Sequence, residues 1–379
     1  MRFPLIRTIV ASAAAVLLLA APASAIETLA KQAILIDYAT GDVLFEKNAD
    51  QVMTPSSMSK MATVYKLFEA LKEGRLSLED TFPVSERAWR KQGSKMFVPL
   101  GGRVKVDDLM KGIIVQSGND ACIVVAEGLA GSEDAFAEEL NALAKKLGMN
   151  SSHFVNASGW PDPGHVSTAR DLATLAMATL HDFPEFYHYY SEKNFVYNNI
   201  KQGNRDPLLY KDIGADGLKT GHTDDGGYGL TASAVRNGRR LVLVVNGLSS
   251  MKERGTEAEH LLDYGFREFN SYNLFAANST VGDAPVWLGT EKKVPMVLQK
   301  SLTINMPIKS RKDMVVKEIY DSPIKAPIAA GQRIATLRIE VPERAPMEFP
   351  LVAGASVDKL GVVSRLGAAL HYIMWGENG

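Results

Sequence analysis

The sequence predicts an α/β (α+β) domain built on an antiparallel sheet with flanking helices, followed by a small all-β domain. Over residues 26–275, segments with the apolar periodicity of helices alternate with short strand-like segments that are joined by turns. Over residues 276–353, short strand-like runs are separated by Pro, Gly and Asp, and no segment has convincing helical periodicity. Over residues 354–379, apolar residues return in a single helical stripe.

Residues 1–25 have the three parts of a cleavable secretory signal. Arg2 and Arg7 come first, an apolar run covers residues 9–21, and the tripeptide Ala-Ser-Ala precedes the expected cleavage site. A transmembrane helix is the alternative, but the apolar run is shorter than the roughly 20 residues that span a bilayer. We therefore expect a mature chain that begins at Ile26 and is exported to the periplasm.

Charge and cysteine content exclude two classes of protein. The formal net charge is −1, and removal of the leader with its two arginines leaves −3. No broad basic field would attract nucleic acid, so we expect small exported substrates instead. Cys122 is the single cysteine, which rules out a disulfide within the chain. It lies in the apolar stretch ACIVVA, which favours a buried, unreactive thiol over a nucleophile.

The first domain should begin with a hairpin and a clearly marked helix. Residues 32–48 are typical of two short strands around a turn at 40–42. Thr54 is the expected N-cap of the helix, with Pro55 at its first position and Gly74 as its C-cap. Between them runs an apolar stripe at helical spacing, which consists of Met58, Met61, Val64, Tyr65, Phe68 and Leu71.

Further helices and one hairpin complete this domain. Helices are expected at 106–147, with breaks near 117–120 and 128–134, at 169–180 within an otherwise irregular stretch, and at 253–269. The dipeptide Asn-Gly at 237–238 separates strands at 228–235 and 240–248 and predicts a tight hairpin.

The tail predicts an amphipathic helix with two possible uses. Its stripe consists of Leu360, Val363, Leu366, Leu370, Ile373 and Met374. Tyr372 and Trp375 near its end fit a membrane interface, which is the use that we favour. The alternative is a helix packed on its own domain, and Gly361 and Gly367 lower its helical propensity.

The candidate chemistry starts from Ser57 and Lys60 in the stretch PSSMSKMAT. A serine hydroxyl needs a base within hydrogen-bond reach, and a spacing of three on a helix places both side chains on one face. Lysine can act as that base only if burial or a nearby cation lowers its pKa. Taken alone, the pattern S-x-x-K is weak, because chance produces it often and an N-cap serine beside a solvated lysine is the better explanation.

Two downstream stretches change this interpretation. Ser117-Gly118-Asn119 and Lys219-Thr220-Gly221 follow in the order of the three-element pattern of penicillin-interacting serine acyl transferases. Ser117 can pass a proton to the leaving amine, Asn119 can hold a substrate amide, and Lys219 can order Ser117 and depress the pKa of Lys60. Gly221 lets a strand edge approach the substrate closely, and Thr220 with an arginine could hold a terminal carboxylate.

Longer stretches extend the likeness. VQSGNDACIVVAEGLAG, DGLKTGHTDDGGYGLTASA and ERGTEAEHLLDYGF resemble the D-alanyl-D-alanine carboxypeptidases among the low-molecular-mass penicillin-binding proteins. The resemblance covers nearly the whole mature chain. It implies a serine β-lactamase/transpeptidase-like catalytic domain, no cofactor, and two kinds of ligand: peptidoglycan stem peptides ending in D-Ala-D-Ala, and β-lactam antibiotics.

The resemblance also assigns roles to individual residues. It implies that Ser57 forms the acyl-enzyme, that Lys60 is the general base, and that the backbone N–H groups of Ser57 and His222 form the oxyanion hole. It implies that Arg254 binds the substrate carboxylate. The remaining members of the acid–base and binding network are Ser117, Asn119, Lys219, Thr220 and Gly221.

Several alternatives remain open at this point. A class A β-lactamase would carry S-D-N and a glutamate in an E-x-x-L-N stretch, but here the triplet is SGN and Ala137 precedes Leu140-Asn141. An endopeptidase of the same fold and a non-catalytic cell-wall binding protein are the other candidates. No H-E-x-x-H spacing is present, so no metal is implied.

Overall fold

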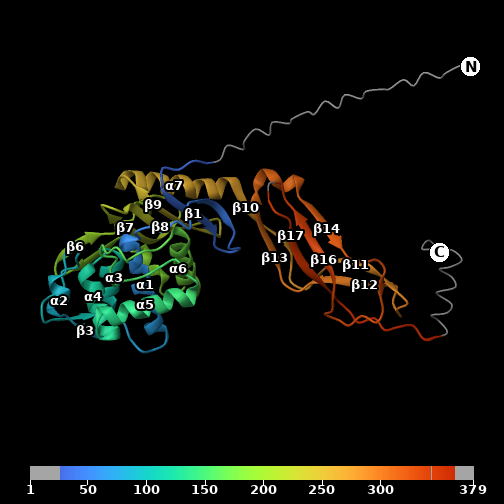
Figure 1. The fold of residues 1–379 in the computed structure, drawn as a ribbon, viewed down its shortest axis with the longest axis horizontal. Helices are drawn as coiled ribbons and strands as arrows, with labels where there is room; N and C mark the ends of the chain where they lie inside the picture. The colour runs from blue at the N-terminus through green and yellow to red at the C-terminus, as the bar shows by residue number, and fades with distance from the viewer. Residues whose placement is uncertain (1–25, 343, 363–379) are drawn as a thin grey trace, which may run out of the picture.

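The computed structural model describes residues 26–342 and 344–362, which form two domains arranged end to end (Figure 1). The leader, expected at residues 1–25, and most of the expected tail helix lie outside these residues. The first domain contains the helices α1 (Lys60–Lys72), α2 (Glu86–Arg90), α3 (Val106–Ile114), α4 (Asn119–Ala130), α5 (Glu133–Leu147), α6 (Ala169–Asp182) and α7 (Met251–Glu268).

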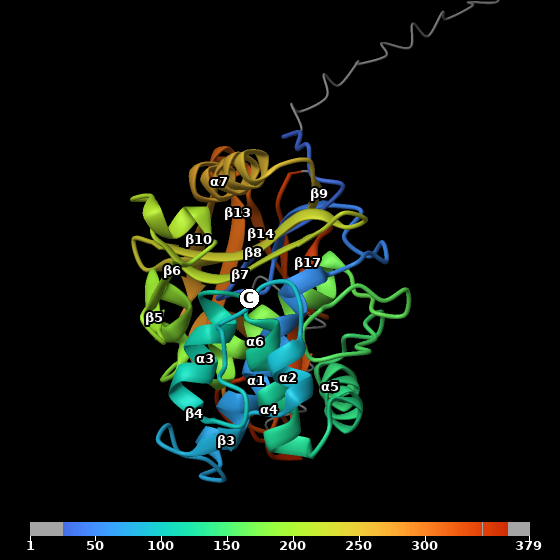
Figure 2. The same cartoon turned by 90° about the vertical axis from the view of Figure 1, so that its left-hand side faces the viewer.

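A five-stranded antiparallel sheet with the order β2-β1-β9-β8-β7 forms the centre of the first domain. Its strands are β1 (Gln32–Asp37), β2 (Val43–Lys47), β7 (Ala215–Thr223), β8 (Gly227–Arg236) and β9 (Arg239–Leu248). Figure 2 shows α7 on one face of the sheet and helices α1 to α6 on the other. The predicted hairpins at 32–48 and 228–248 and the predicted helices at 169–180 and 253–269 are therefore present.

The alternation of side chains along β9 explains this layered arrangement. Val242 and Val244 pack into the core formed with helices α1 and α3 to α6, whereas Leu241 and Leu243 pack against α7. A strand that is apolar on both faces must be covered on both faces. Burial of these two faces supplies most of the driving force for folding of this domain.

The first helix begins differently from the sequence prediction. Residues 56–59 form a 3-10 turn, η1 (Ser56–Ser59), whose N-cap is Pro55, and the α-helix itself begins at Lys60. Thr54 is therefore not the N-cap. The C-cap is Glu73, and Gly74 follows it with φ +69, which is the left-handed position that glycine commonly takes just after a helix.

The first domain also contains short elements that were not predicted from the sequence. They are β3 (Thr81–Pro83), β4 (Arg103–Lys105), β5 (Asn194–Tyr197), β6 (Ile200–Gly203), η2 (Tyr187–Ser191) and η3 (Pro207–Tyr210). The segment predicted as mostly helical over 106–147 consists of α3, α4 and α5, and its breaks fall at the two predicted places.

The second domain is an all-β unit with its own apolar core. Its strands are β10 (Phe269–Phe275), β11 (Ser279–Trp287), β12 (Lys293–Leu298), β13 (Leu302–Pro307), β14 (Val315–Ile319), β15 (Ile324–Lys325), β16 (Arg333–Glu340) and β17 (Met347–Ala353), with a 3-10 turn η4 (Ile308–Asp313). Six of them form the sheet β14-β16-β17-β12-β11-β15, and β10 pairs with β13.

The ends of this domain differ from the predicted limits of 276 and 353. β10 follows α7 directly and pairs with β13, so the first strand of the β domain lies before residue 276. Beyond β17, Val357 and Lys359 form bridges to Ile328 and Gly289. The first residues of the predicted helix at 354–379 therefore belong to the β domain.

One partly buried arginine connects the two domains. The guanidinium of Arg239 donates hydrogen bonds to Asp37 Oδ2 (2.7 Å), to the Phe269 carbonyl (2.7 Å) and to Asn305 Oδ1 (2.9 Å). These partners lie on β1, β10 and β13. Asn305 in turn donates from Nδ2 to Thr40 Oγ1 (3.2 Å). The junction is therefore held by polar contacts that converge on Arg239 and Asn305.

Candidate active site

Ser57 and Lys60 lie together where η1 meets α1. Lys60 Nζ donates a hydrogen bond to Ser57 Oγ over 2.9 Å, and the Lys60 side chain is fully buried. Burial, together with the positive charge of Arg205, lowers the pKa of Lys60 to about 8. With this pKa about one-tenth of the amine is neutral at pH 7, far more than for a solvated lysine, and this neutral form can accept the serine proton.

Two groups from other parts of the chain orient the Lys60 amine. Nζ donates to Asn119 Oδ1 over 2.8 Å and to the carbonyl of Ser158. Asn119 is the first residue of α4, and its Nδ2 donates to the Gln92 carbonyl over 2.9 Å. The carboxamide of Asn119 is thus bonded at both ends within the protein and fixes the position of Lys60 beneath the nucleophile.

Ser117 lies above these residues, at the turn between α3 and α4. It has φ +61, and its buried Oγ has no hydrogen-bond partner among the described residues. Lys219, which was expected to order Ser117, donates from Nζ to the Thr220 carbonyl over 3.1 Å and forms no hydrogen bond with Ser117 Oγ. Burial and the charge of Lys60 lower the pKa of Lys219. This repulsion is mutual, so a charged Lys219 equally disfavours a charge on Lys60.

A groove of about 350 Å³ opens above Ser57. It is lined by Ser57, Ser94, Ser117, Arg205, Thr220, Gly221, His222, Tyr228, Met251 and Arg254. Lys60, Asn119 and Lys219 are buried close to the groove but do not line it. The structure therefore brings all nine residues singled out from the sequence to one place.

The strand β7 forms one wall of the groove, because it is an edge strand of the sheet. A Cβ at Gly221 would lie 3.0 Å from the Pro55 carbonyl and 3.1 Å from Met58 Cγ. The glycine therefore permits close packing of β7 on η1, whereas the sequence analysis attributed it to approach of the substrate. This packing places Ser57 and His222, whose backbone N–H groups are the expected oxyanion donors, on the same groove.

Arg254 approaches the groove from the first turn of α7. Its side chain is 4% exposed, and Nη2 donates to the Arg205 carbonyl over 3.1 Å. Its guanidinium lies 5.8 Å from the centre of the Tyr228 ring, and this ring stacks on His222 at 3.9 Å between centroids. An arginine remains charged in such a setting, so the site offers a fixed cation to an anionic ligand.

Four residues of the groove were missed by the sequence analysis. They are Ser94, Arg205, Tyr228 and Met251. Arg205 Nη1 donates to Ser94 Oγ over 2.7 Å and adds a second guanidinium to the groove. It lies in an irregular stretch without periodicity, so only its positive charge beside Asp206-Pro207 could have drawn attention to it.

Two serines beside the nucleophile are not the ordinary helix residues that the sequence analysis expected. Ser56 is buried with φ +51, and its Oγ lies 3.0 Å from Thr223 Oγ1. Ser59 is also buried, and its hydroxyl donates to the Ser56 carbonyl over 2.6 Å. Both hydroxyls are therefore committed to contacts within the protein, which leaves Ser57 as the serine of this cluster that lines the groove.

Cys122 is buried in α4, as predicted, and burial raises the pKa of its thiol to about 12. A thiol with so high a pKa is a poor nucleophile at neutral pH. Within residues 26–342 and 344–362, no group of three or more His, Cys, Asp and Glu side chains is placed to hold a metal ion.

Comparison with known proteins assigns both domains. The family model described as D-alanyl-D-alanine carboxypeptidase matches residues 19–250, and the model described as penicillin-binding protein 5, C-terminal domain, matches residues 269–359. D-alanyl-D-alanine carboxypeptidase DacD of Salmonella typhimurium is 38% identical over 341 residues, which are 88% of this chain and 87% of that protein.

Solved structures show the same likeness. Penicillin binding protein 5 from Haemophilus influenzae aligns with a TM-score of 0.78 and 34% identity, over 88% of this chain and 99% of that one. D-alanyl-D-alanine carboxypeptidase DacD from Francisella tularensis aligns with a TM-score of 0.81 and 31% identity, over 88% of this chain and 95% of that one. The chain therefore belongs to the D-alanyl-D-alanine carboxypeptidase family.

Proposed function

We propose that this protein is a serine-type D-alanyl-D-alanine carboxypeptidase that removes the terminal D-alanine from peptidoglycan pentapeptides through an acyl-enzyme on Ser57. The observation that carries the proposal is the contact between the buried Lys60 amine and Ser57 Oγ at 2.9 Å, at the floor of a groove that also presents Arg254. A nucleophile, a base of lowered pKa and a fixed cation thus meet at one place.

Acylation begins when the neutral Lys60 amine takes the Ser57 proton. Ser57 Oγ then attacks the carbonyl carbon of the penultimate D-alanine, and the backbone N–H groups of Ser57 and His222 stabilise the oxyanion. As the C–N bond breaks, the leaving amine takes a proton that passes through Ser117. Water then attacks the ester and gives a proton to Lys60, which passes it to Ser57 Oγ as the ester bond breaks, so the shortened peptide leaves and the free serine is restored.

Cations at one end of the groove favour removal of a terminal residue. Arg254 and Thr220 are positioned to hold the carboxylate of the last D-alanine, and Arg205 adds a second positive charge. A guanidinium binds a carboxylate through paired hydrogen bonds, so the carboxylate position also fixes the scissile bond over Ser57. A crosslinked peptide without a free carboxylate at this place would lose these contacts, which favours a carboxypeptidase over an endopeptidase.

β-Lactams are the second class of ligand, and the matched Haemophilus protein is itself named a penicillin binding protein. Ser57 Oγ would attack the lactam carbonyl and open the ring, which remains attached as an ester. A β-lactamase would require a base that hydrolyses this ester quickly. Ala137 occupies the position where a class A enzyme carries its glutamate, and Asn141 is committed to hydrogen bonds with the Phe154 backbone. These contacts favour the peptidase.

We further propose that the mature protein acts in the periplasm, on the outer face of the inner membrane. The leader at residues 1–25 and the apolar stripe of the tail support this location. Within residues 26–342 and 344–362, no helix is both long enough and apolar enough to cross a bilayer. Liposome flotation of the mature chain and of a chain ending at Ala355 tests the tail; equal flotation of both would remove the proposed anchor.

One pair of assays tests the enzymatic proposal. Purified mature protein is mixed with diacetyl-L-lysyl-D-alanyl-D-alanine, and released D-alanine is measured beside a Ser57→Ala variant. Release by the wild type alone is the expected result. Absence of release together with absence of penicillin labelling would leave a non-catalytic cell-wall binding protein, and rapid penicillin turnover without release would indicate a β-lactamase.

A further inference from the structure

His165 is a buried histidine that no step of the proposed reaction uses. His165 is 1% exposed and lies at the end of the loop over residues 156–165. The backbone N–H of Val155 donates to its Nδ1 over 3.1 Å, so Nδ1 carries no proton. The proton therefore lies on Nε2, which donates to Ser59 Oγ over 2.8 Å.

The Ser59 hydroxyl connects His165 to the backbone next to the nucleophile. Because Oγ accepts from His165, its own proton is free to donate, and it does so to the Ser56 carbonyl over 2.6 Å. Ser56 has φ +51, a left-handed conformation that costs a non-glycine residue about 1–2 kcal/mol. The next residue is Ser57, so the orientation of the Ser56–Ser57 peptide group directly sets where Ser57 Oγ points.

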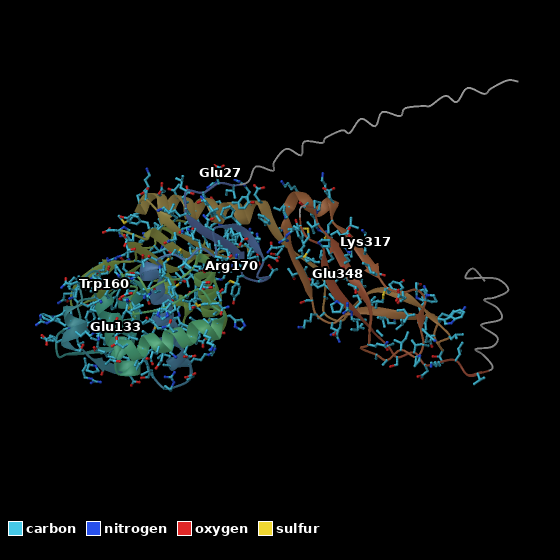
Figure 3. The ribbon with its side chains drawn as sticks, in the orientation of Figure 1. Glu27, Glu133, Trp160, Arg170, Lys317 and Glu348 are labelled. Carbon is cyan, nitrogen blue, oxygen red and sulfur yellow. The ribbon has the colours of Figure 1, made fainter. Side chains whose placement is uncertain are left out.

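The loop over 156–165 supports this turn at further points. A Cβ at Gly159 would lie 1.9 Å from the Ser56 carbonyl oxygen, so the loop backbone lies directly against that carbonyl. One residue earlier, the Ser158 carbonyl accepts a hydrogen bond from Lys60 Nζ. Both the nucleophile turn and the base therefore rest on one loop, and His165 attaches that loop to Ser59. Figure 3 shows Trp160, from the same loop, on the catalytic domain at the side away from the β domain.

We infer that His165 is a positioning residue for acylation, which acts through the Ser59 hydroxyl to hold the left-handed turn that presents Ser57 to the substrate. The inference rests on the proposed function of Ser57 as the nucleophile. A neutral histidine suits this task, because only the neutral ring can accept at Nδ1 while it donates at Nε2. Burial and the positive charge of Lys60 lower the pKa of His165 to about 4, which keeps the ring neutral at the pH of the periplasm.

Two substitutions distinguish the role of the donor Nε2 from that of the acceptor Nδ1 of His165. His165→Gln places an amide N–H near the position of Nε2 and keeps a donor for Ser59, whereas His165→Asn can replace only the acceptor for Val155. The rate constant for acylation of Ser57 by a fluorescent penicillin is measured for each variant, together with its thermal unfolding midpoint. We expect His165→Asn to lose roughly tenfold or more in this rate, and His165→Gln to retain most of it.

Ser59→Ala removes the same contact without changing the histidine, and it should slow acylation as His165→Asn does. The double variant should lose no more than the slower single variant, because both changes break one chain of hydrogen bonds. His181→Asn is the matched control, because the His181 side chain is exposed and, among the described residues, forms a polar contact with its neighbour Asp182 alone. It should acylate at the wild-type rate.

The outcomes distinguish the inference from the proposed function. A wild-type protein that penicillin does not acylate would overturn both. A wild type that acylates normally, with His165→Asn and Ser59→Ala equally fast and folded, would overturn the inference alone. If His165→Asn does not fold, Ser59→Ala decides: a slower rate supports the role of the hydroxyl contact, and an unchanged rate contradicts it.

Discussion

Lys60 Nζ lies 2.9 Å from Ser57 Oγ, and the lysine side chain is fully buried. Burial is what makes the contact chemically useful, because a solvated lysine would hold its proton well above neutral pH. The interpretation of Lys60 as a base predicts that Lys60→Met lowers the acylation rate by about 10²- to 10⁴-fold, the range typical of general base catalysis. Stopped-flow measurement with a fluorescent penicillin checks this.

Lys72→Met is the matched control, because Lys72 belongs to the same helix but its side chain is half exposed at the far end. Lys60→Arg should be as inactive as Lys60→Met, because a guanidinium stays protonated. An arginine variant that acylates at the wild-type rate would contradict the role of Lys60 as a base.

The same lysine predicts the pH dependence of acylation. The base must be deprotonated to act, so the rate constant should rise as pH increases through about 8, the pKa of Lys60. Arg205→Gln removes a positive charge that lowers this pKa, so the midpoint of the profile should move to higher pH. Pre-steady-state rates between pH 6 and about 9.5 measure both profiles. A profile that falls over this range would exclude the neutral amine as the base.

Arg254 predicts selectivity for a free carboxylate. Arg254→Gln should reduce kcat/KM for a D-Ala-D-Ala peptide by roughly ten- to a hundredfold, since charge-assisted hydrogen bonds contribute about 1.5–3 kcal/mol. The wild type should lose a similar factor when the terminal carboxylate is amidated, and the variant should lose little more. If amidation penalised the variant as strongly as the wild type, the carboxylate would have to bind elsewhere.

Asp37 and Arg239 predict a large contribution to stability at the domain junction. Asp37 is fully buried and its pKa is lowered: burial alone would raise it, but hydrogen bonds from Asn305 and Arg239 outweigh that effect. Arg239→Leu leaves this carboxylate without its cation, so we expect the free energy of unfolding at pH 7 to fall by about 3–5 kcal/mol. Urea unfolding measures it.

The sign of the pH effect follows from the lowered pKa. The contribution of Asp37 should be present at neutral pH and lost as pH falls through its folded-state pKa, so wild type and Arg239→Leu should converge in stability under acid. Arg267→Leu is the control, because the side chain of that arginine is exposed and, within the part of the chain that the structure describes, pairs with Glu268 alone. A control loss as large as that of Arg239→Leu would contradict a specific role for the junction.

Cys122 predicts a lack of reactivity. Because the thiol is fully buried and its pKa is raised to about 12, a disulfide reagent such as DTNB should fail to modify the folded protein and should react promptly in urea. Absorbance of the released thiolate follows the reaction. Rapid modification of the native protein would show that Cys122 is accessible.

The parts of this molecule that the sequence predicted are those with local signals. The spacing of Ser57 and Lys60, the Asn-Gly hairpin and the apolar stripe of α1 each depend on residues that are close in the chain. The order of the three motifs indicated the protein family, and the family pattern in turn singled out Ser117, Asn119 and Lys219. Contacts across the fold were out of reach. Nothing near Arg205 indicates that its carbonyl would meet Arg254, which lies 49 residues later.

The prediction of where the first helix starts was wrong for the same reason. Thr54 and Pro55 are good local signals for a helix start, but tertiary contacts with Gly159 and Thr223 hold Ser56 in a left-handed conformation and delay the α-helix until Lys60. The boundary near residue 275 is a similar case, because β10 owes its place to pairing with β13. Local periodicity cannot reveal such distant partners.

Mapping of the acylated residue tests the central claim most directly. Mature protein is labelled with penicillin and digested, and tandem mass spectrometry locates the adduct. The expected result is one penicillin per chain on Ser57, with no adduct in Ser57→Ala and no D-alanine release by that variant. An adduct on Ser56, Ser59 or Ser117, or D-alanine release by Ser57→Ala, would contradict the assignment of Ser57 as the nucleophile.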